Sequence, residues 1–189
     1  CERNGRVVFS GLSFSVTAGQ YAELLGPNGS GKSSLLRLLA GLVPAAAGSV
    51  SAAPAGETQL PQLCHYIGHH DALKYVMTVR ENIAFWARML GGTEGGSSLA
   101  AFNMERLADE PVQLLSAGQR RRLSLSRLLA ANRPVWLLDE PMTALDVNSQ
   151  KTLTTLVDTH LAGGGIVLAA IHGEGLRTPD HVITLKGAA

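Results

Sequence analysis

The segment 26–34, GPNGSGKSS, constrains the fold of this 189-residue chain more than any other stretch. It matches the pattern G-x-x-x-x-G-K-[S/T], which ends at Lys32 and Ser33. Glycines allow successive backbone N–H groups to turn toward one anion, and a helix that starts at the lysine adds its positive end. The pattern needs a buried strand before it and a helix after it. YAELLG (21–26) and KSSLLRLLAGL (32–42) have those properties, so we predict a strand, a phosphate-binding loop and a helix.

Each residue type in this loop has a chemical task on a nucleoside triphosphate with Mg²⁺. Lys32 supplies a mobile positive charge for the β and γ phosphates, and the Ser33 hydroxyl is expected to ligate Mg²⁺. The rest of the loop is expected to surround the phosphates; its members are Gly26, Pro27, Asn28, Gly29, Ser30, Gly31 and Ser34.

The segment VWLLDE (135–140) is the expected second half of the site. Its four apolar residues predict a buried strand that brings Asp139 to the strand's end, where a carboxylate can hold Mg²⁺. Glu140 is then placed to orient or deprotonate a water. The alternative is that Glu140 is a solvated loop acid beside Pro141.

The segment LSAGQ (115–119) predicts a second helix start that could bind an anion. Ser116 is a natural N-cap, and Gly118 leaves backbone donors exposed. One nucleotide does not need two such sites unless the second serves a nucleotide held by another subunit. A capped helix with no further role is the alternative.

Strands and helices alternate along the chain in the manner of a mainly parallel α/β sheet. Thr78 and Glu81 predict a capping box at the start of a helix. We expect a single domain in which 1–77 and 115–189 form the core and 78–114 is an inserted helical subdomain. The expected strands lie in 6–16, 21–26, 135–140, 165–172 and 181–185. The expected helices start at 32, 78, 99 and 114, and another lies between 140 and 165. Residues 91–98 are an expected loop.

Charge and cysteine content restrict the functional classes. The 16 Lys and Arg residues nearly balance the 15 Asp and Glu residues, so nothing favours nucleic-acid binding. The run Arg120, Arg121 and Arg122 is interpreted as a solvated helix face. Cys1 and Cys64 provide no disulfide framework. No apolar run reaches the ~18 residues of a membrane span, so a membrane role would need a partner. Because the sequence starts at Cys1 and not at Met, we expect residues before it.

In their order and spacing, GPNGSGKSS, LSAGQ and VWLLDE resemble the motifs of the ATP-binding-cassette (ABC) ATPases. The resemblance implies a P-loop NTPase fold of the ABC type, with a mainly parallel core sheet, an N-terminal antiparallel β portion and the helical subdomain. It implies a head-to-tail homodimer that binds two ATP molecules between its subunits. Residues Ser116, Ala117, Gly118 and Gln119, here called the signature turn, would then contact the ATP of the other subunit. Asp146 in TALD (143–146) would couple the two sites, and His172 would contact the γ-phosphate.

Within this family, the segments HYIGHHDALK (65–74) and LLSAGQRRRLSLSRLLA (114–130) are most similar to the ATP-binding subunits of the haem exporters of cytochrome c maturation. That similarity implies an integral-membrane partner subunit and a peripheral position on the cytoplasmic face of the bacterial inner membrane. The function implied is haem export or release of a haem-loaded chaperone. Three alternatives are an ABC ATPase for another substrate, a soluble mechanical or regulatory cassette, and a sensor that binds ATP without hydrolysis.

Two departures from the family pattern are visible. In many cassettes an aromatic residue stacks on adenine, and it lies about twenty positions before the phosphate loop. Here the first aromatic residue is Phe9, and the planar guanidinium of Arg3 is a candidate to stack on adenine instead. His69 stands where the family usually has a glutamine that binds Mg²⁺. Since imidazole is a poor ligand for Mg²⁺, we expect His69 to sense the phosphate or its water, or to act at the partner interface, and His70 to face the partner or solvent. A metal or haem site formed by the two histidines is the alternative.

Overall fold

The computed structural model describes residues 1–3, 5–52, 58–92, 96–173 and 175–186. The chain forms two compact units. Unit 1 consists of 1–68, 133–141 and 158–189, and unit 2 consists of 69–132 and 142–157. Neither unit is one continuous stretch, since the chain passes between them after residues 68, 132, 141 and 157.

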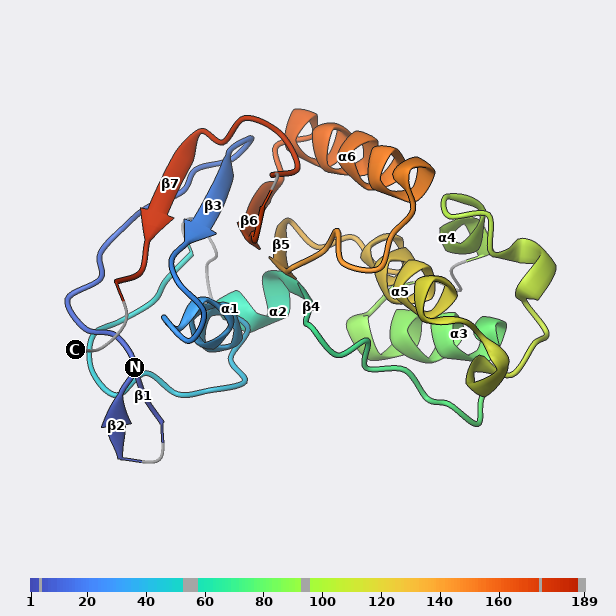
Figure 1. The fold of residues 1–189 in the computed structure, drawn as a ribbon, viewed down its shortest axis with the longest axis horizontal. Coiled ribbons are helices and arrows are strands. Elements are labelled where there is room, and N and C mark those ends of the chain that lie inside the picture. The colour runs from blue at the N-terminus through green and yellow to red at the C-terminus, as the bar shows by residue number, and fades with distance from the viewer. Residues whose placement is uncertain (4, 53–57, 93–95, 174, 187–189) are drawn as a thin grey trace. The chain divides into compact units, whose positions relative to one another are not determined.

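Unit 1 is built on a five-stranded sheet in which every neighbouring pair is parallel. This arrangement confirms the predicted parallel α/β core. From one edge to the other the strands are β4 (Cys64–Ile67), β5 (Val135–Asp139), β6 (Ile166–Ala170), β3 (Tyr21–Leu25) and β7 (His181–Thr184) (Figure 1). Strand β4 was not predicted, and it follows the short helix α2 (Leu60–Leu63).

The core of unit 1 lies between this sheet and α1 (Lys32–Leu39). The buried face of this helix carries Leu35, Leu36 and Leu39. They pack with the side chains of Leu24 and Leu137 from the sheet. Every residue of β5 is buried, as expected for an inner strand of a parallel sheet that is covered on both faces.

The N-terminal β portion is an antiparallel pair of two-residue strands, β1 (Glu2–Arg3) and β2 (Arg6–Val7). The prediction of strand structure over 6–16 is wrong beyond Val7. Residues 8–16 form no strand, and Gly11 has a backbone φ of 65°, which interrupts an extended chain. In this stretch the side chain of Phe9 packs against the phosphate loop instead.

Unit 2 is helical over the residues that the structure describes. Its α-helices are α3 (Val79–Leu90), α4 (Gly96–Ala100), α5 (Ala117–Ser126) and the first part of α6 (Val147–Ala162), whose last residues belong to unit 1. Short 3₁₀ turns connect them: η1 (Glu105–Leu107), η2 (Val112–Leu114) and η3 (Arg127–Leu129). None of the helices in the described ranges is long and apolar enough to cross a bilayer.

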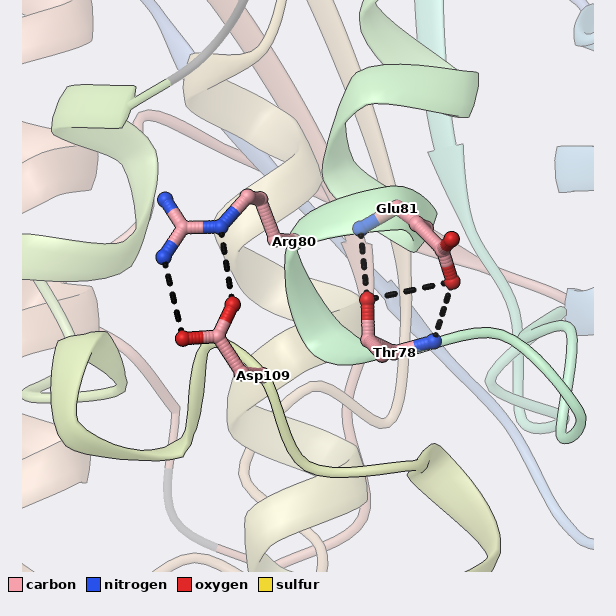
Figure 2. A network of polar contacts seen from close by, with 4 residues as sticks. All are labelled: Thr78, Arg80, Glu81 and Asp109. Atoms are coloured by element: carbon pink, nitrogen blue, oxygen red, sulfur yellow. Dashed lines mark hydrogen bonds and ion pairs between the residues drawn. The ribbon is translucent and has the colours of Figure 1, made fainter.

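The capping box at the start of α3 is confirmed. The Glu81 N–H donates to the Thr78 hydroxyl at 3.2 Å, and the Thr78 N–H donates to the Glu81 carboxylate at 2.8 Å (Figure 2). Next to it, the exposed side chains of Arg80 and Asp109 form an ion pair at 3.1 Å (Figure 2). The helix ends at Gly91 in the left-handed conformation.

The predicted loop 91–98 and helix 99–108 are placed differently in the structure. Helix α4 already begins at Gly96, and it ends at Ala100. Asn103 has a left-handed φ of 53°, which a continuous α-helix does not allow, so the chain turns there before η1. Residues 93–95 of the predicted loop lie outside the described ranges.

Candidate functional site

The carboxyl ends of three adjacent strands in unit 1 bring the predicted site segments to one edge of the sheet. Asp139 at the end of β5 pairs with Ala170 of β6, and Ala170 pairs with Leu24 of β3. The phosphate loop follows β3, Glu140 follows β5, and His172 stands two residues after β6. In open parallel sheets this edge is the usual place for a ligand.

Two glycines of the loop lie where a side chain has no room. A Cβ on Gly31 would stand 2.7 Å from Val8 Cγ1 and 2.9 Å from the ring of Phe9, and Gly31 has a φ of 101°. A Cβ on Gly26 would overlap the carbonyl oxygen of Leu185. Gly31 is the N-cap of α1 and no side chain caps that helix, so its first N–H groups are open to an anionic ligand.

Lys32 is buried inside the curve of the loop. Its Nζ donates to the carbonyl of Gly26 at 2.6 Å and to that of Pro27 at 3.2 Å, and the residue is only 7% exposed. The hydroxyl of Ser30 is also buried, and within the described chain it has no hydrogen-bond partner. A cation and a buried hydroxyl inside a loop of glycines fit a phosphate ligand.

The two predicted Mg²⁺ ligands lie together. The Ser33 hydroxyl donates to Asp139 Oδ1 at 3.0 Å, and Asp139 is 2% exposed. One hydroxyl oxygen and one carboxylate, both at the edge of the phosphate loop, are the kind of oxygen donors that Mg²⁺ prefers. The residues present therefore fit this ion.

Sequence reasoning missed two residues beside Asp139. Arg37 of α1 donates from Nε to the hydroxyl of Tyr66 at 3.3 Å, and the Asp139 carboxylate lies close enough to that hydroxyl to raise its pKa. The pKa of Tyr66 is raised, mainly by burial and further by the Asp139 carboxylate. Tyr66 belongs to β4, which the sequence did not predict, so nothing in the motif pattern indicated this contact.

Glu140 is held in a strained backbone conformation, and His172 lies in an exposed position. The Glu140 N–H donates to the carbonyl of Ala170 at 2.9 Å, and its φ of 48° lies in the left-handed region. A non-glycine residue held there costs about 1–3 kcal/mol, and such strain is concentrated at functional sites. His172 is exposed beyond the end of β6.

The signature turn lies in unit 2 and begins with a second capping box. The Gln119 N–H donates to the Ser116 hydroxyl at 3.2 Å, and the Ser116 N–H donates to Gln119 Oε1 at 2.7 Å, which confirms Ser116 as the N-cap. A Cβ on Gly118 would stand 3.2 Å from the carbonyl oxygen of Ala144. The segment 143–146 is therefore packed against the signature turn.

Asp146 has a structural contact of its own. Its carboxylate accepts from the Ser149 N–H at 2.8 Å in the first turn of α6. This hydrogen bond is the main reason that the pKa of Asp146 is lowered. The exposed carboxylate is thus ionised, which suits the predicted role in a polar contact between subunits.

The two neighbouring histidines lie at a hollow of about 480 Å³ in unit 2. Both side chains are exposed, with their ring centroids 5.6 Å apart in a T-shaped arrangement. Within the described ranges no group of three His, Cys, Asp or Glu side chains could hold a metal ion. The hollow is lined by His69, His70, Asp71, Ala72, Leu73, Tyr75, Ala117, Arg120, Arg121, Thr143 and Ala144.

The interpretation of residues 120–122 as a solvated helix face is wrong for Arg121. This residue is 4% exposed and forms an ion pair with Asp71 at 3.2 Å. Arg120 is partly buried and donates to the carbonyl of Leu115 at 2.6 Å. Burial in this part of α5 is nearly continuous, because Leu123, Ser124, Leu125 and Ser126 are buried as well, so the segment leaves no solvated face for Arg121.

Comparison of the amino-acid sequence with known proteins identifies a family to which this chain is similar. A model of the ABC transporter family matches residues 9–143. A cytochrome c biogenesis ATP-binding export protein CcmA from Nitrobacter winogradskyi is 54% identical over 175 residues, which cover 91% of this chain and 88% of that protein. The protein of the same name from Rhodospirillum rubrum is 47% identical over 194 residues, covering 100% of this chain and 80% of the relative.

Solved structures share the fold. An ATP-binding subunit of an ABC transporter superposes with a TM-score of 0.86 at 23% identity, covering 97% of this chain and 82% of the other. A dimeric post-hydrolysis state of an ATP-binding cassette, bound to ADP and Pi, superposes with a TM-score of 0.78 at 24% identity, covering 95% and 86%. The family match and the close relatives agree with the motif geometry: the chain belongs to the ABC transporter family and is an ABC-type ATPase.

Proposed function

We propose that this chain is the ATP-hydrolysing subunit of an ABC exporter in cytochrome c biogenesis, which drives haem export or the release of a haem-loaded chaperone. The name of its relatives, which span most of the chain, supports the pathway. The cargo follows from the resemblance of 65–74 and 114–130 to haem-exporter subunits. The observation that carries the catalytic part is the contact of Ser33 with Asp139 beside the phosphate loop.

The residues of unit 1 would divide the work on ATP as follows. The loop backbone of 26–31 and Lys32 would bind the phosphates, and Ser33 with Asp139 would hold Mg²⁺, which when bound neutralises phosphate charge. Glu140 would take a proton from the attacking water. His172 would hold that water and the γ-phosphate by hydrogen bonding.

The signature turn would act on the ATP of a second copy of the chain. It is a helix start at the exposed residues Ser116 and Ala117, and a helix start favours an anion, yet unit 1 already contains a complete phosphate loop. A homodimer with two shared ATP sites gives both loops a ligand. The dimeric arrangement of a related cassette supports this proposal, and Asp146 would be placed between the two sites.

We place the helical subdomain of the cassette at 78–114 and the core at 1–77 and 115–189. Export requires a membrane-embedded partner, because ATP hydrolysis by this subunit must act on a path through the bilayer. The subunit would therefore lie as a peripheral protein on the cytoplasmic face of the bacterial inner membrane. His69 would lie near the γ-phosphate or the partner, and His70 would face the partner or solvent.

Glu140→Gln provides the decisive experiment. The amide preserves the size and shape of the side chain but cannot accept the water proton. We expect the variant to bind ATP, to form a stable ATP-bound dimer and to lose turnover by about a hundredfold or more, as general-base removal typically does. ATPase assays and gel filtration with ATP and Mg²⁺ measure both effects.

Glu110→Gln is the matched control, because Glu110 is an exposed acid in unit 2 with no assigned role in hydrolysis. It should hydrolyse ATP at the rate of the unmodified protein. Normal hydrolysis in Glu140→Gln would overturn the catalytic proposal. Failure to co-purify a polytopic membrane protein from detergent-solubilised membranes of the source cell would overturn the exporter assignment.

A further inference from the structure

We propose that Asp71 is a positioning residue that fixes the histidine loop (69–73) to the helix of the signature turn, so that the two move as one body. The inference rests on the proposed function, in which the histidine loop senses the nucleotide and the signature turn engages the second copy. It assigns a task to a residue that no catalytic motif includes.

Both ends of Asp71 are bound to the same helical segment. Its carboxylate accepts from Arg121 Nη1 at 3.2 Å. Its backbone carbonyl accepts from the Ser124 hydroxyl at 3.1 Å and from Arg127 Nη1 at 3.0 Å. Arg121 and Ser124 belong to α5, whose N-cap is Ser116, and Arg127 directly follows it in η3.

These contacts are buried and charged. Arg121, Ser124 and Arg127 are 4%, 0% and 6% exposed, respectively. Two guanidinium groups removed from water need hydrogen-bond acceptors, and Asp71 provides its carboxylate to Arg121 and its backbone carbonyl to Arg127. The Asp71 side chain is 20% exposed and that of Arg121 only 5%, so salt screens this ion pair less than it screens an exposed one.

The next residue of the loop is attached to α3. The Ala72 carbonyl accepts from Trp86 Nε1 at 3.2 Å, and the Trp86 ring lies 3.8 Å from the guanidinium of Arg127. Ala72 has a left-handed φ of 52°, a conformation that a residue with a Cβ keeps only where its surroundings enforce it. At the far end, Lys74 exchanges backbone hydrogen bonds at 2.8 and 3.0 Å with the buried Asn82 side chain.

The histidine loop is therefore attached, through Asp71, to the helix that presents the signature turn. A displacement of His69 or His70 would pull on α5 and shift the signature turn toward or away from the ATP of the second copy. Through this attachment, the nucleotide bound at one ATP site could change how the signature turn contacts the ATP at the other site.

Asp71→Asn tests the proposal, since it removes the negative charge and leaves the backbone bonds in place. In the unmodified catalytic background we expect kcat to fall, because turnover needs the signature turn in contact with the ATP of the second copy. In the Glu140→Gln background, ATP-driven dimer formation should weaken about tenfold, within the usual range of coupling between sites, while the Kd of the monomer for ATP changes less than about twofold. Hydrogen exchange in the monomer should rise together at amides 69–74 and 117–120.

Asp109→Asn is the matched control, because it makes the same chemical change in the same unit at an exposed ion pair with Arg80. It should leave all four readouts unchanged. Should Asp71→Asn not fold, Ser124→Ala decides the question, because it removes one hydrogen bond to the loop and should give the same pattern at smaller amplitude.

Exchange that rises only at 69–74, with dimerisation and kcat preserved, would overturn the inference and leave Asp71 a purely local contact. The exchange measurement needs no ATP, so it decides the positioning role by itself. If Glu140→Gln with Asp71 intact forms no ATP-bound dimer, the proposed function has failed, and that result is separate from the exchange pattern.

Discussion

Cys64 shows how a single buried side chain ties stability to pH. Cys64 lies in β4 and is 5% exposed, and its Sγ contacts the carbonyl of Leu60 at 3.2 Å. Burial raises the pKa of the thiol to about 12. The unfolded chain would ionise this thiol near its ordinary pKa of about 8.5. Its contribution to stability is therefore fully present below pH ~8.5 and is lost as pH rises toward 12.

We predict that the stability advantage of the unmodified protein over Cys64→Ala shrinks on raising the pH from 8 to 10.5. The loss should approach ~1.4 kcal/mol per pH unit above the pKa of the unfolded thiol, which is about 2–3 kcal/mol over this range. Urea unfolding of both proteins at each pH measures the difference, and the Ala variant removes the effect of all other titrating groups. A difference that stays constant with pH would contradict the prediction.

At the scale of single residues, the sequence predicted contacts made by motif residues and missed those made by others. Ser33 and Asp139 could be expected to meet, because the pattern implies a shared ion. Tyr66 beside Arg37 and Asp71 beside Arg121 could not, because these pairs depend on which face of a strand or helix turns inward. Three consecutive arginines look the same in the sequence whether one of them is buried or none.

Two helices of unit 2 start with a capping box. Comparison of the two caps can therefore separate helix stabilisation from a role in ATP binding between subunits. Thr78 caps α3 and Ser116 caps α5, each with a reciprocal partner three residues later. We predict that Thr78→Ala and Ser116→Ala each lower the free energy of unfolding by about 1 kcal/mol, the usual cost of losing such a cap. Thermal unfolding of both variants checks this.

Only Ser116→Ala is expected to lose ATP-driven dimerisation in the Glu140→Gln background, because only that cap belongs to the signature turn. Thr78→Ala serves as its matched control for helix destabilisation. Equal dimerisation of the two variants would show that Ser116 is only a helix cap, which is the alternative left open by its sequence.

Elements marked by an apolar run or by helical spacing were predicted well, and elements without such a pattern were missed or misplaced. Helices α1, α3 and α5 and strands β3, β5, β6 and β7 all lie within their expected segments. Strand β4, with the sequence CHYI, lacks the apolar run that marked the inner strands, and it is formed by its pairing with β5. Helix α4 starts within a run of Gly and Ser, where local preference opposes helix and tertiary contacts with η3 decide.

At the scale of the whole molecule, the chain crosses from unit 1 to unit 2 at two points, and each lies directly after a segment of the candidate site. The chain leaves unit 1 at Gly68 just after β4, and again at Pro141 just after Glu140. His69 is thus the first residue of unit 2. We predict that His69→Gln keeps ATPase activity coupled to the membrane partner, because the amide can replace the hydrogen bonds of a neutral imidazole, whereas His69→Ala loses it.

Reconstituted membranes with and without the partner measure this coupling, and His181→Ala in unit 1 is a control for loss of an exposed histidine elsewhere. Loss of haem binding by the isolated cassette in both His69 variants would contradict the prediction and favour the alternative of a haem-binding histidine pair.

The interleaved order of the two units also limits how this cassette can be divided in the laboratory. Unit 1 is assembled from three stretches of chain and unit 2 from two. No single cut in the gene yields either unit intact, so a fragment ending at residue 132 would lack β5, β6 and β7 and with them most of the sheet. Exchange of unit 2 between related cassettes therefore needs 69–132 and 142–157 together, and a chimera with a single crossover always combines unit 1 from two parents.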